Sequence, residues 1–419
     1  MKMVYLILFA AFMLVSCSAK DNKKQTELPD NMALASSIHV VEAKESSAVE
    51  EAPEELSELV EEETEPPIET KTKAEEILAK MSVEEKLGQL FICAFRKDAF
   101  GSGITGISPE AIEAVEKYHI GGVVLFRENI ASQKQTAEYI SNLQMLSNIP
   151  LFIGVDEEGG IVRRTQSLEV PSVGSQFSIA KEGEAAVYSS AKAIAEYLTP
   201  MGFNLNFAPV ADIFSNPSNT VIAQRAYGTD EKTVSSALPY AVKAYNEAGM
   251  VSVLKHFPGH GDTLEDSHYG LAFTRKALDE LREMELKPFA AGIEAGAPMV
   301  MAGHICAPNI TDDNEPAIFS HRLITEILRG EMGFSGIVIT DAMDMGALNS
   351  YSAEESALKA FEAGVDILLM PPDYKAAYSG LLEALLSGEI TSEQLDEKVL
   401  RILECKEKFM LLDNYENLD

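Results

Sequence analysis

The chain has few basic residues for its length. Its 34 Lys and Arg stand against 66 Asp and Glu, which gives a formal net charge of −32 over 419 residues. Binding to nucleic-acid phosphates needs a basic stripe or cluster, and the sequence contains no such group of Lys and Arg. The composition therefore excludes a nucleic-acid-binding protein, whereas 46% hydrophobic residues are enough for a large globular core.

Cysteine is also scarce, with four residues in the whole sequence. Cys93, Cys306 and Cys405 are odd in number and widely spaced, so a disulfide framework is not expected. We expect these three side chains to be packed thiols. The sequence also lacks an internal repeat of solenoid length.

No apolar run at the N-terminus is long enough to span a bilayer comfortably. Residues 1–17, MKMVYLILFAAFMLVSC, carry one lysine, an apolar stretch and small residues before a cysteine, which is typical of a secretory signal. The end of this segment resembles a bacterial lipobox, in which the cysteine thiol takes a lipid. The resemblance implies an exported bacterial lipoprotein, anchored to a membrane through Cys17 and facing the periplasm or the exterior. An ordinary cleaved signal with an incidental cysteine is the alternative.

The segment after this signal has little to bury. Residues 42–69 are rich in glutamate and poor in aromatic residues, which is typical of a disordered, self-repelling chain. We therefore interpret residues 18–71 as a disordered acidic linker that tethers a single folded domain, residues 72–413, followed by a C-terminal tail at residues 414–419. We expect the protein to be a monomer.

Eight short apolar runs rich in β-branched residues recur along the folded part, and they suit strands buried on both faces of a parallel sheet. Segments with helical periodicity lie between them, and Ser82 with Glu85 and Thr391 with Gln394 fit capping boxes. Another helix is expected between Ser320 and Gly330. The alternation predicts an α/β fold, a single (β/α)8 TIM-type barrel, with a doubly wound sheet as the alternative. The runs are residues 89–95, 121–126, 151–155, 204–210, 251–256, 299–304, 336–340 and 365–370.

Polar and charged residues gather where the predicted strands end. Active sites of (β/α)8 barrels lie on the loops that follow the C-terminal ends of the strands. A chance scatter would have spread such residues over helix faces and both ends of the strands. The placement therefore predicts an active site built from Asp156, Glu157, Asp212, Lys255, His256, His304 and Asp341.

The segment after the fifth predicted strand reads KHFPGHGDTLEDSH, residues 255–268. Proline and glycine after Phe257 end the strand, because proline lacks a donor and glycine permits a sharp turn. Asp266 and His268 follow on an irregular segment, where a carboxylate beside an imidazole supports a general acid. A zinc site made by His256, His260 and His268 is the alternative, although a loop that contains proline does not place them on one helical face.

The motifs resemble, jointly and in order, the β-N-acetylglucosaminidase branch of glycoside hydrolase family 3. Besides KHFPGHGDTLEDSH, these are VDEEGGIVRR at residues 155–164, NFAPVADI at 206–213, AQRAYGTD at 223–230 and ITDAMDM at 339–345. The resemblance implies that Asp341 is the nucleophile, His268 the general acid/base and Asp266 its partner. It also implies that N-acetylglucosamine hydroxyls are held by Asp156, Arg164, Arg225, Lys255 and His256.

The resemblance further implies a retaining, exo-acting β-N-acetylglucosaminidase that needs no cofactor and no metal. The expected location outside the cytoplasm favours peptidoglycan fragments that carry terminal N-acetylglucosamine as the substrate, with chitin oligosaccharides second. Two residues depart from the family pattern: Glu157 stands where glutamine is common, and Asp344 adds a second carboxylate near Asp341. A phosphorylase of the same family and a non-catalytic sugar-binding lipoprotein are the alternative functions. The roles of Asp344, His260, His304 and Asp212 stay open.

Overall fold

The structure is a computed structural model that describes residues 71–264 and 270–413. The described residues belong to one compact unit, Ile68–Asp419. The predictions for the signal segment with Cys17, for the linker up to residue 70, for Asp266 and His268, and for the tail lie outside the described residues.

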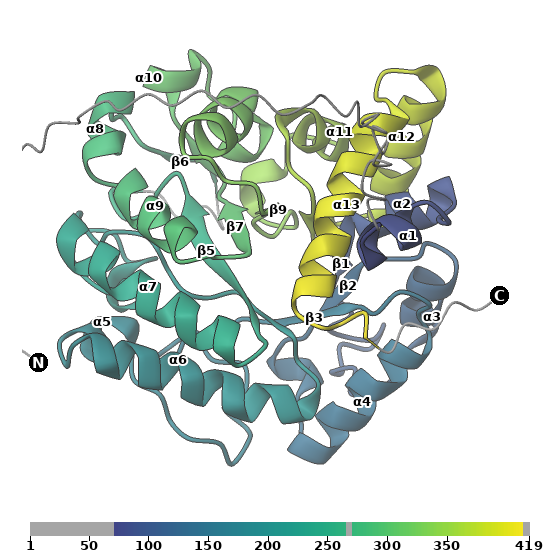
Figure 1. Ribbon diagram of the computed structural model, residues 1–419, viewed down its shortest axis with the longest axis horizontal. Helices are drawn as coiled ribbons and strands as arrows, with labels where there is room; N and C mark the ends of the chain where they lie inside the picture. Colours follow the sequence, from purple (N-terminus) through teal and green to yellow (C-terminus); the bar gives the residue numbers. More distant parts are fainter. Residues whose placement is uncertain (1–70, 265–269, 414–419) are drawn as a thin grey trace, which may run out of the picture. The chain divides into compact units, whose positions relative to one another are not determined.

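A parallel eight-stranded sheet curls into a barrel at the centre of the described chain, and helices enclose it (Figure 1). Neighbouring strands follow the order β10-β1-β2-β3-β4-β5-β7-β9. A parallel bridge between Ile339 and Ile367 joins the two edge strands, so the ring closes. Each strand lies within or almost within one predicted run: β1 (Phe91–Cys93), β2 (Gly122–Val124), β3 (Phe152–Val155), β4 (Leu205–Asn206), β5 (Val251–Phe257), β7 (Met299–Ala302), β9 (Ile337–Thr340) and β10 (Leu368–Leu369). The predicted barrel is confirmed, and the doubly wound alternative is wrong because the strand order never reverses.

Helices alternate with these strands, and both predicted capping boxes are present. Ser82 accepts from the backbone N–H of Glu85 before α2, and Thr391 accepts from that of Gln394 before α13. The helix expected near Ser320 is η5 (Arg322–Glu331), wound as a π-helix. The α-helices are α1 (Lys73–Leu78), α2 (Val83–Gln89), α3 (Pro109–Glu116), α4 (Gln133–Met145), α5 (Gln176–Ala180), α6 (Glu184–Leu198), α7 (Glu231–Glu247), α8 (Leu278–Glu283), α9 (Leu286–Glu294), α10 (Pro308–Thr311), α11 (Ala353–Ala363), α12 (Tyr374–Ser387) and α13 (Ser392–Lys408).

One small element was not predicted. Strands β6 (Ala272–Phe273) and β8 (Ile305–Cys306) form a separate parallel pair. Two-residue strands carry no alternation that a sequence pattern could reveal. Cys93, Cys306 and Cys405 are free and buried, as expected for packed thiols.

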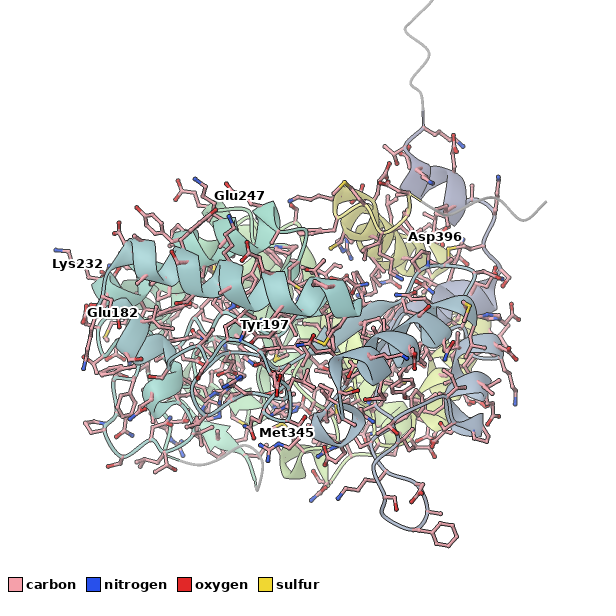
Figure 2. The ribbon with its side chains drawn as sticks, turned by 90° about the horizontal axis from the view of Figure 1, so that it is seen from below. Glu182, Tyr197, Lys232, Glu247, Met345 and Asp396 are labelled. Atoms are coloured by element: carbon pink, nitrogen blue, oxygen red, sulfur yellow. The ribbon has the colours of Figure 1, made fainter. Side chains whose placement is uncertain are left out.

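The last long helix closes one end of the barrel. Ile402 and Cys405 of α13, with Phe409 just after it, belong to the same buried cluster as the inward-facing strand residues. Lys406 is also buried there, and its Nζ donates to Gln89 Oε1 at 2.7 Å and to Gly121 O at 3.3 Å, just before β1 and β2 begin. Figure 2 shows Asp396 of α13 and Met345, which lines the pocket described below, on opposite sides. The C-terminal ends of the strands are therefore left for a site. No helix in the described ranges has the length and apolar character needed to cross a membrane.

Candidate active site

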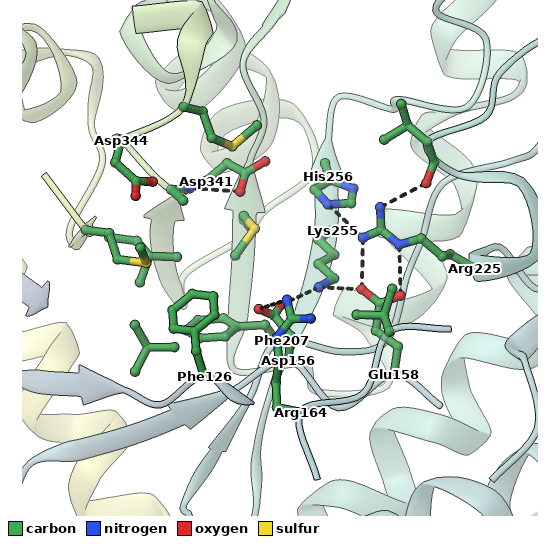
Figure 3. Close-up of a pocket in the computed structure, with 18 of the residues that line it drawn as sticks. Phe126, Asp156, Glu158, Arg164, Phe207, Arg225, Lys255, His256, Asp341 and Asp344 are labelled. Atoms are coloured by element: carbon green, nitrogen blue, oxygen red, sulfur yellow. Dashed lines mark hydrogen bonds and ion pairs between the residues drawn. The ribbon is translucent and has the colours of Figure 1, made fainter. Parts of the chain in front are cut away.

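A pocket of about 840 Å³ opens at the C-terminal ends of the barrel strands (Figure 3). Six of the predicted site residues line it: Asp156, Arg164, Arg225, Lys255, His256 and Asp341. Residues far apart in the sequence are thus brought together at one end of the barrel, where the fold predicts a site. The predicted acid/base pair, Asp266 and His268, lies outside the described residues.

Asp341 stands directly after β9 and is held by backbone groups on both sides. Its N–H donates to Ala302 O at 2.8 Å, and its Oδ1 accepts from the N–H of Ala342 at 2.8 Å. Burial alone would raise the pKa of Asp341, but His256, His304, the Ala342 N–H and Lys255 together lower it below its usual value. The side chain is therefore a carboxylate over the whole neutral range, as a nucleophile requires.

One wall of the pocket is a row of alternating charges, Arg225, Glu158, Lys255, Asp156 and Arg164, which we call the charged wall (Figure 3). The pairs are Arg225 with Glu158 at 2.8 and 2.9 Å, Lys255 with Glu158 at 2.7 Å, Lys255 with Asp156 at 3.0 Å, and Arg164 with Asp156 at 3.0 Å. Burial opposes ionisation of Glu158, yet Arg225 and Lys255 hold its pKa well below the usual value. Burial likewise opposes ionisation of Asp156, and Lys255 and Arg164 lower its pKa. Both carboxylates are therefore fixed acceptors, and the cations keep N–H donors at the pocket surface.

Glu158, which was not predicted from the sequence, lines the pocket in place of the predicted Glu157. The Glu157 side chain is fully buried and points away, where its Oε2 accepts from Arg164 N at 2.8 Å and its Oε1 from Thr165 Oγ1 at 2.7 Å. Tyr197 also donates to it, at 2.8 Å. Glu157 thus anchors the loop that carries Arg164. The available signal was spacing, since residues two apart on an extended segment share a face, which pairs Asp156 with Glu158.

His256 and His260 are organised by Asp212, whose side chain is inaccessible to solvent. Asp212 Oδ2 lies 2.7 Å from His256 Nδ1, and Oδ1 accepts from the backbone N–H of His260 at 2.7 Å. Gly261 is required beside them, because a Cβ there would lie 1.7 Å from Ile213 O. Burial and then His256 lower the pKa of His260.

Two of the three histidines of the alternative zinc site are described, and each uses Nδ1 within the protein. His256 Nδ1 faces Asp212, and His260 Nδ1 lies 2.6 Å from Thr263 Oγ1. Their rings are nearly perpendicular, with centroids 5.9 Å apart. Within residues 71–264 and 270–413, no group of three or more His, Cys, Asp or Glu is arranged to hold a metal ion.

Further polar residues line the pocket or lie beside it. Arg96 pairs with Glu128 at 2.7 Å, and its guanidinium carbon lies 4.2 Å from the centre of the Phe126 ring. Asp344 also lines the pocket, so a second carboxylate does stand near Asp341. His304 Nε2 lies 2.9 Å from Ala342 O, beside the predicted nucleophile. His304 therefore helps to fix the backbone turn that follows β9.

A parallel barrel with charged residues at the C-terminal ends of its strands is an enzyme architecture, and the sequence matches one known family of this kind. Residues 82–405 match the model of the glycosyl hydrolase family 3 N-terminal domain, and the chain belongs to this family.

Similar proteins within the family are named for a narrower activity than the family itself. The chain is 34% identical over 367 residues to beta-hexosaminidase A of Pseudoalteromonas piscicida, covering 78% of this chain and 61% of that protein. It is 38% identical over 277 residues to a beta-hexosaminidase of Xanthomonas oryzae, covering 64% and 82%. A solved family 3 beta-N-acetylglucosaminidase of a Paenibacillus species superposes with a TM-score of 0.76 at 35% identity, covering 81% of this chain and 64% of that one. The chain thus spans less than two thirds of some relatives that it matches.

Proposed function

We propose that the protein is a retaining, exo-acting β-N-acetylglucosaminidase that releases terminal β-linked N-acetylglucosamine. The observation that carries the proposal is a half-buried, ionised Asp341 in the same pocket as a wall of fixed donors and acceptors. Such a wall suits an uncharged ligand rich in hydroxyls, because each hydroxyl both donates and accepts. Beta-hexosaminidase is also the name of the curated relatives, and beta-N-acetylglucosaminidase that of a solved neighbour.

In the proposed mechanism Asp341 attacks the anomeric carbon, and a bond from its carboxylate oxygen forms as the bond to the leaving oxygen breaks. His268, supported by Asp266, gives its proton to that oxygen. In the second step His268 takes a proton from water, whose oxygen displaces Asp341 and restores the carboxylate. Two displacements at the same carbon retain the anomeric configuration.

The signal-like residues 1–17 support export, and an exported enzyme would meet its substrate outside the cytoplasm, so we propose peptidoglycan fragments first and chitin oligosaccharides second. Purified protein is incubated with muropeptides and with chitobiose, and products and initial anomer are followed by NMR. Release of β-N-acetylglucosamine from the non-reducing end is the expected result. A mechanism-based fluorosugar should label Asp341; an adduct on Asp344, or an initial α-anomer, contradicts the assignment.

Phosphorolysis is a second candidate because a structural neighbour is described as a beta-glucoside phosphorylase, with a TM-score of 0.74 at 27% identity. A histidine acid/base is neutral after giving up its proton, so it repels phosphate less than a carboxylate would. Products formed with and without phosphate distinguish the two reactions. The third candidate, a non-catalytic sugar-binding lipoprotein, predicts unchanged substrate after long incubation.

We also propose that the protein is an exported lipoprotein held to a membrane by a lipid on Cys17, and that it is a monomer. The lipobox-like residues 14–17 and the acidic segment after them support the anchor. Labelled fatty acid fed to the native cell type should appear in the protein. Light scattering of the soluble domain measures its oligomeric state.

A further inference from the structure

Asp212 receives hydrogen bonds on both carboxylate oxygens. The N–H of His260 donates to Oδ1 at 2.7 Å, and that of His256 lies 3.2 Å from both oxygens. His256 Nδ1 lies 2.7 Å from Oδ2. Because a buried carboxylate can only accept, the short contact to Oδ2 requires a proton on Nδ1.

The other ring nitrogen of His256 faces a group that can only donate. Arg225 Nη2 lies 3.4 Å from Nε2. The same guanidinium donates from Nε and Nη2 to Glu158 and from Nη1 to Val221 O. A guanidinium has five N–H donors and no acceptor, so its contact with Nε2 is favourable only when Nε2 keeps its lone pair.

We infer that Asp212 is a positioning residue that holds His256 in the tautomer with the proton on Nδ1, so that Nε2 accepts from Arg225. Asp212 and Arg225 approach the ring from opposite sides and demand the same tautomer. The ring therefore links the buried carboxylate to the charged wall and supports Arg225 in its bidentate pairing with Glu158. The inference deepens the proposed function and rests on it for the kinetic test alone.

Asp212→Asn tests the tautomer with little change in shape. In the wild type both oxygens of Asp212 accept hydrogen bonds, whereas the amide of the variant has one oxygen that accepts and one NH2 group that donates. The backbone N–H of His260 cannot reverse its role, so the amide oxygen is expected to face it and the NH2 to face His256 Nδ1. The proton of His256 must then move to Nε2, where it opposes the donor of Arg225. Asp230→Asn is the matched control, because this exposed side chain caps α7, does not line the pocket, and asparagine caps equally well.

The measurement is ¹⁵N NMR of histidine-labelled full-length protein, with the His256 signals assigned by their loss in His256→Gln. Wild type and Asp230→Asn should show a protonated Nδ1 and an unprotonated Nε2, and Asp212→Asn the reverse. The wild-type spectrum needs no variant to fold: a proton on Nε2, or on both nitrogens, overturns the inference. Unchanged signals in a folded Asp212→Asn protein overturn it as well.

Kinetics give the second readout, kcat/KM on chitobiose or on whichever disaccharide the wild type cleaves. Asp212→Asn should lower kcat/KM by roughly 10- to 100-fold, the loss found when the partner that orients a metal-bound histidine is removed. Asp230→Asn should match the wild type. A reversed tautomer with kcat/KM within twofold of wild type refutes the positioning role. If the wild type releases no N-acetylglucosamine, the proposed function fails while the spectra still decide the tautomer.

Discussion

Lys406 is expected to make the stability of the protein rise with pH. Burial lowers its pKa from 10.5 to about 7, although the Phe152 ring, 4.9 Å from Nζ, favours the charged form. Between about pH 7 and 10.5 the folded protein holds a neutral amine, whereas the unfolded chain holds an ammonium. Unfolding then takes up a proton, so the free energy of unfolding increases as the pH rises through this window.

The size of the effect follows from the pKa difference. At about 1.4 kcal/mol per pKa unit, Lys406 destabilises the fold by roughly 4 kcal/mol at pH 7 and roughly 2 kcal/mol at pH 9. Lys406→Met removes this cost but leaves Gln89 Oε1 and Gly121 O without this donor, which costs about 1–3 kcal/mol. We expect the variant to be more stable than the wild type by about 1–3 kcal/mol at pH 7, with the advantage gone near pH 9.

Urea denaturation at pH 7, 8 and 9 measures the difference, and groups that titrate in both proteins cancel in it. Lys408→Met is the control because Lys408 is exposed on the same helix. The difference in free energy of unfolding between this variant and the wild type should not change with pH. A constant difference between Lys406→Met and the wild type from pH 7 to pH 9 would refute the reasoning. It would mean that Lys406 is protonated in the folded protein.

Three further predictions concern the site and the anchor. His268→Ala should lower the glycosylation rate on a disaccharide by about 100- to 10,000-fold and much less on an aryl glycoside, with Asp266→Asn in between; equal losses on both substrates would make His268 a binding group. Glu158→Gln should lower the free energy of unfolding by about 3 kcal/mol, because buried Lys255 and half-buried Arg225 lose the carboxylate that they share, and should lower kcat/KM; urea denaturation and initial rates check this, and a stability loss below about 1 kcal/mol would contradict it. Cys17→Ser should abolish labelling by fatty acid in the native cell type, and a wild type that takes up no label would disprove the anchor.

The strands were predictable because each is buried on both faces and so reads as a continuous apolar run. The helix starts at Ser82 and Thr391 were predictable because a cap is a local hydrogen bond between neighbours in the sequence. The role of α13 could not be predicted, because its apolar stripe indicates a buried face but not which residues cover that face. Filling of the barrel end by Ile402, Cys405 and Phe409 is a long-range packing result.

The site was predictable as a location more than as a set of contacts. Barrel geometry brings residues that follow different strands to one end, so Asp156, Lys255 and Asp341 could be grouped from the sequence. The choice between Glu157 and Glu158 depended on which way the chain turns after β3. That direction is set by the buried partners of Glu157, and these lie on other segments.

The charged wall and Asp341 together hold three carboxylates and three cations, so their formal charges cancel in the free protein. Formation of a glycosyl ester would remove the charge of Asp341 and leave one positive charge uncompensated. Small anions would then be drawn to the covalent intermediate more strongly than to the resting enzyme, because a pocket screens charge less than bulk water does. Phosphate and other anions should therefore act on the second half of the turnover, whether as acceptors or as inhibitors.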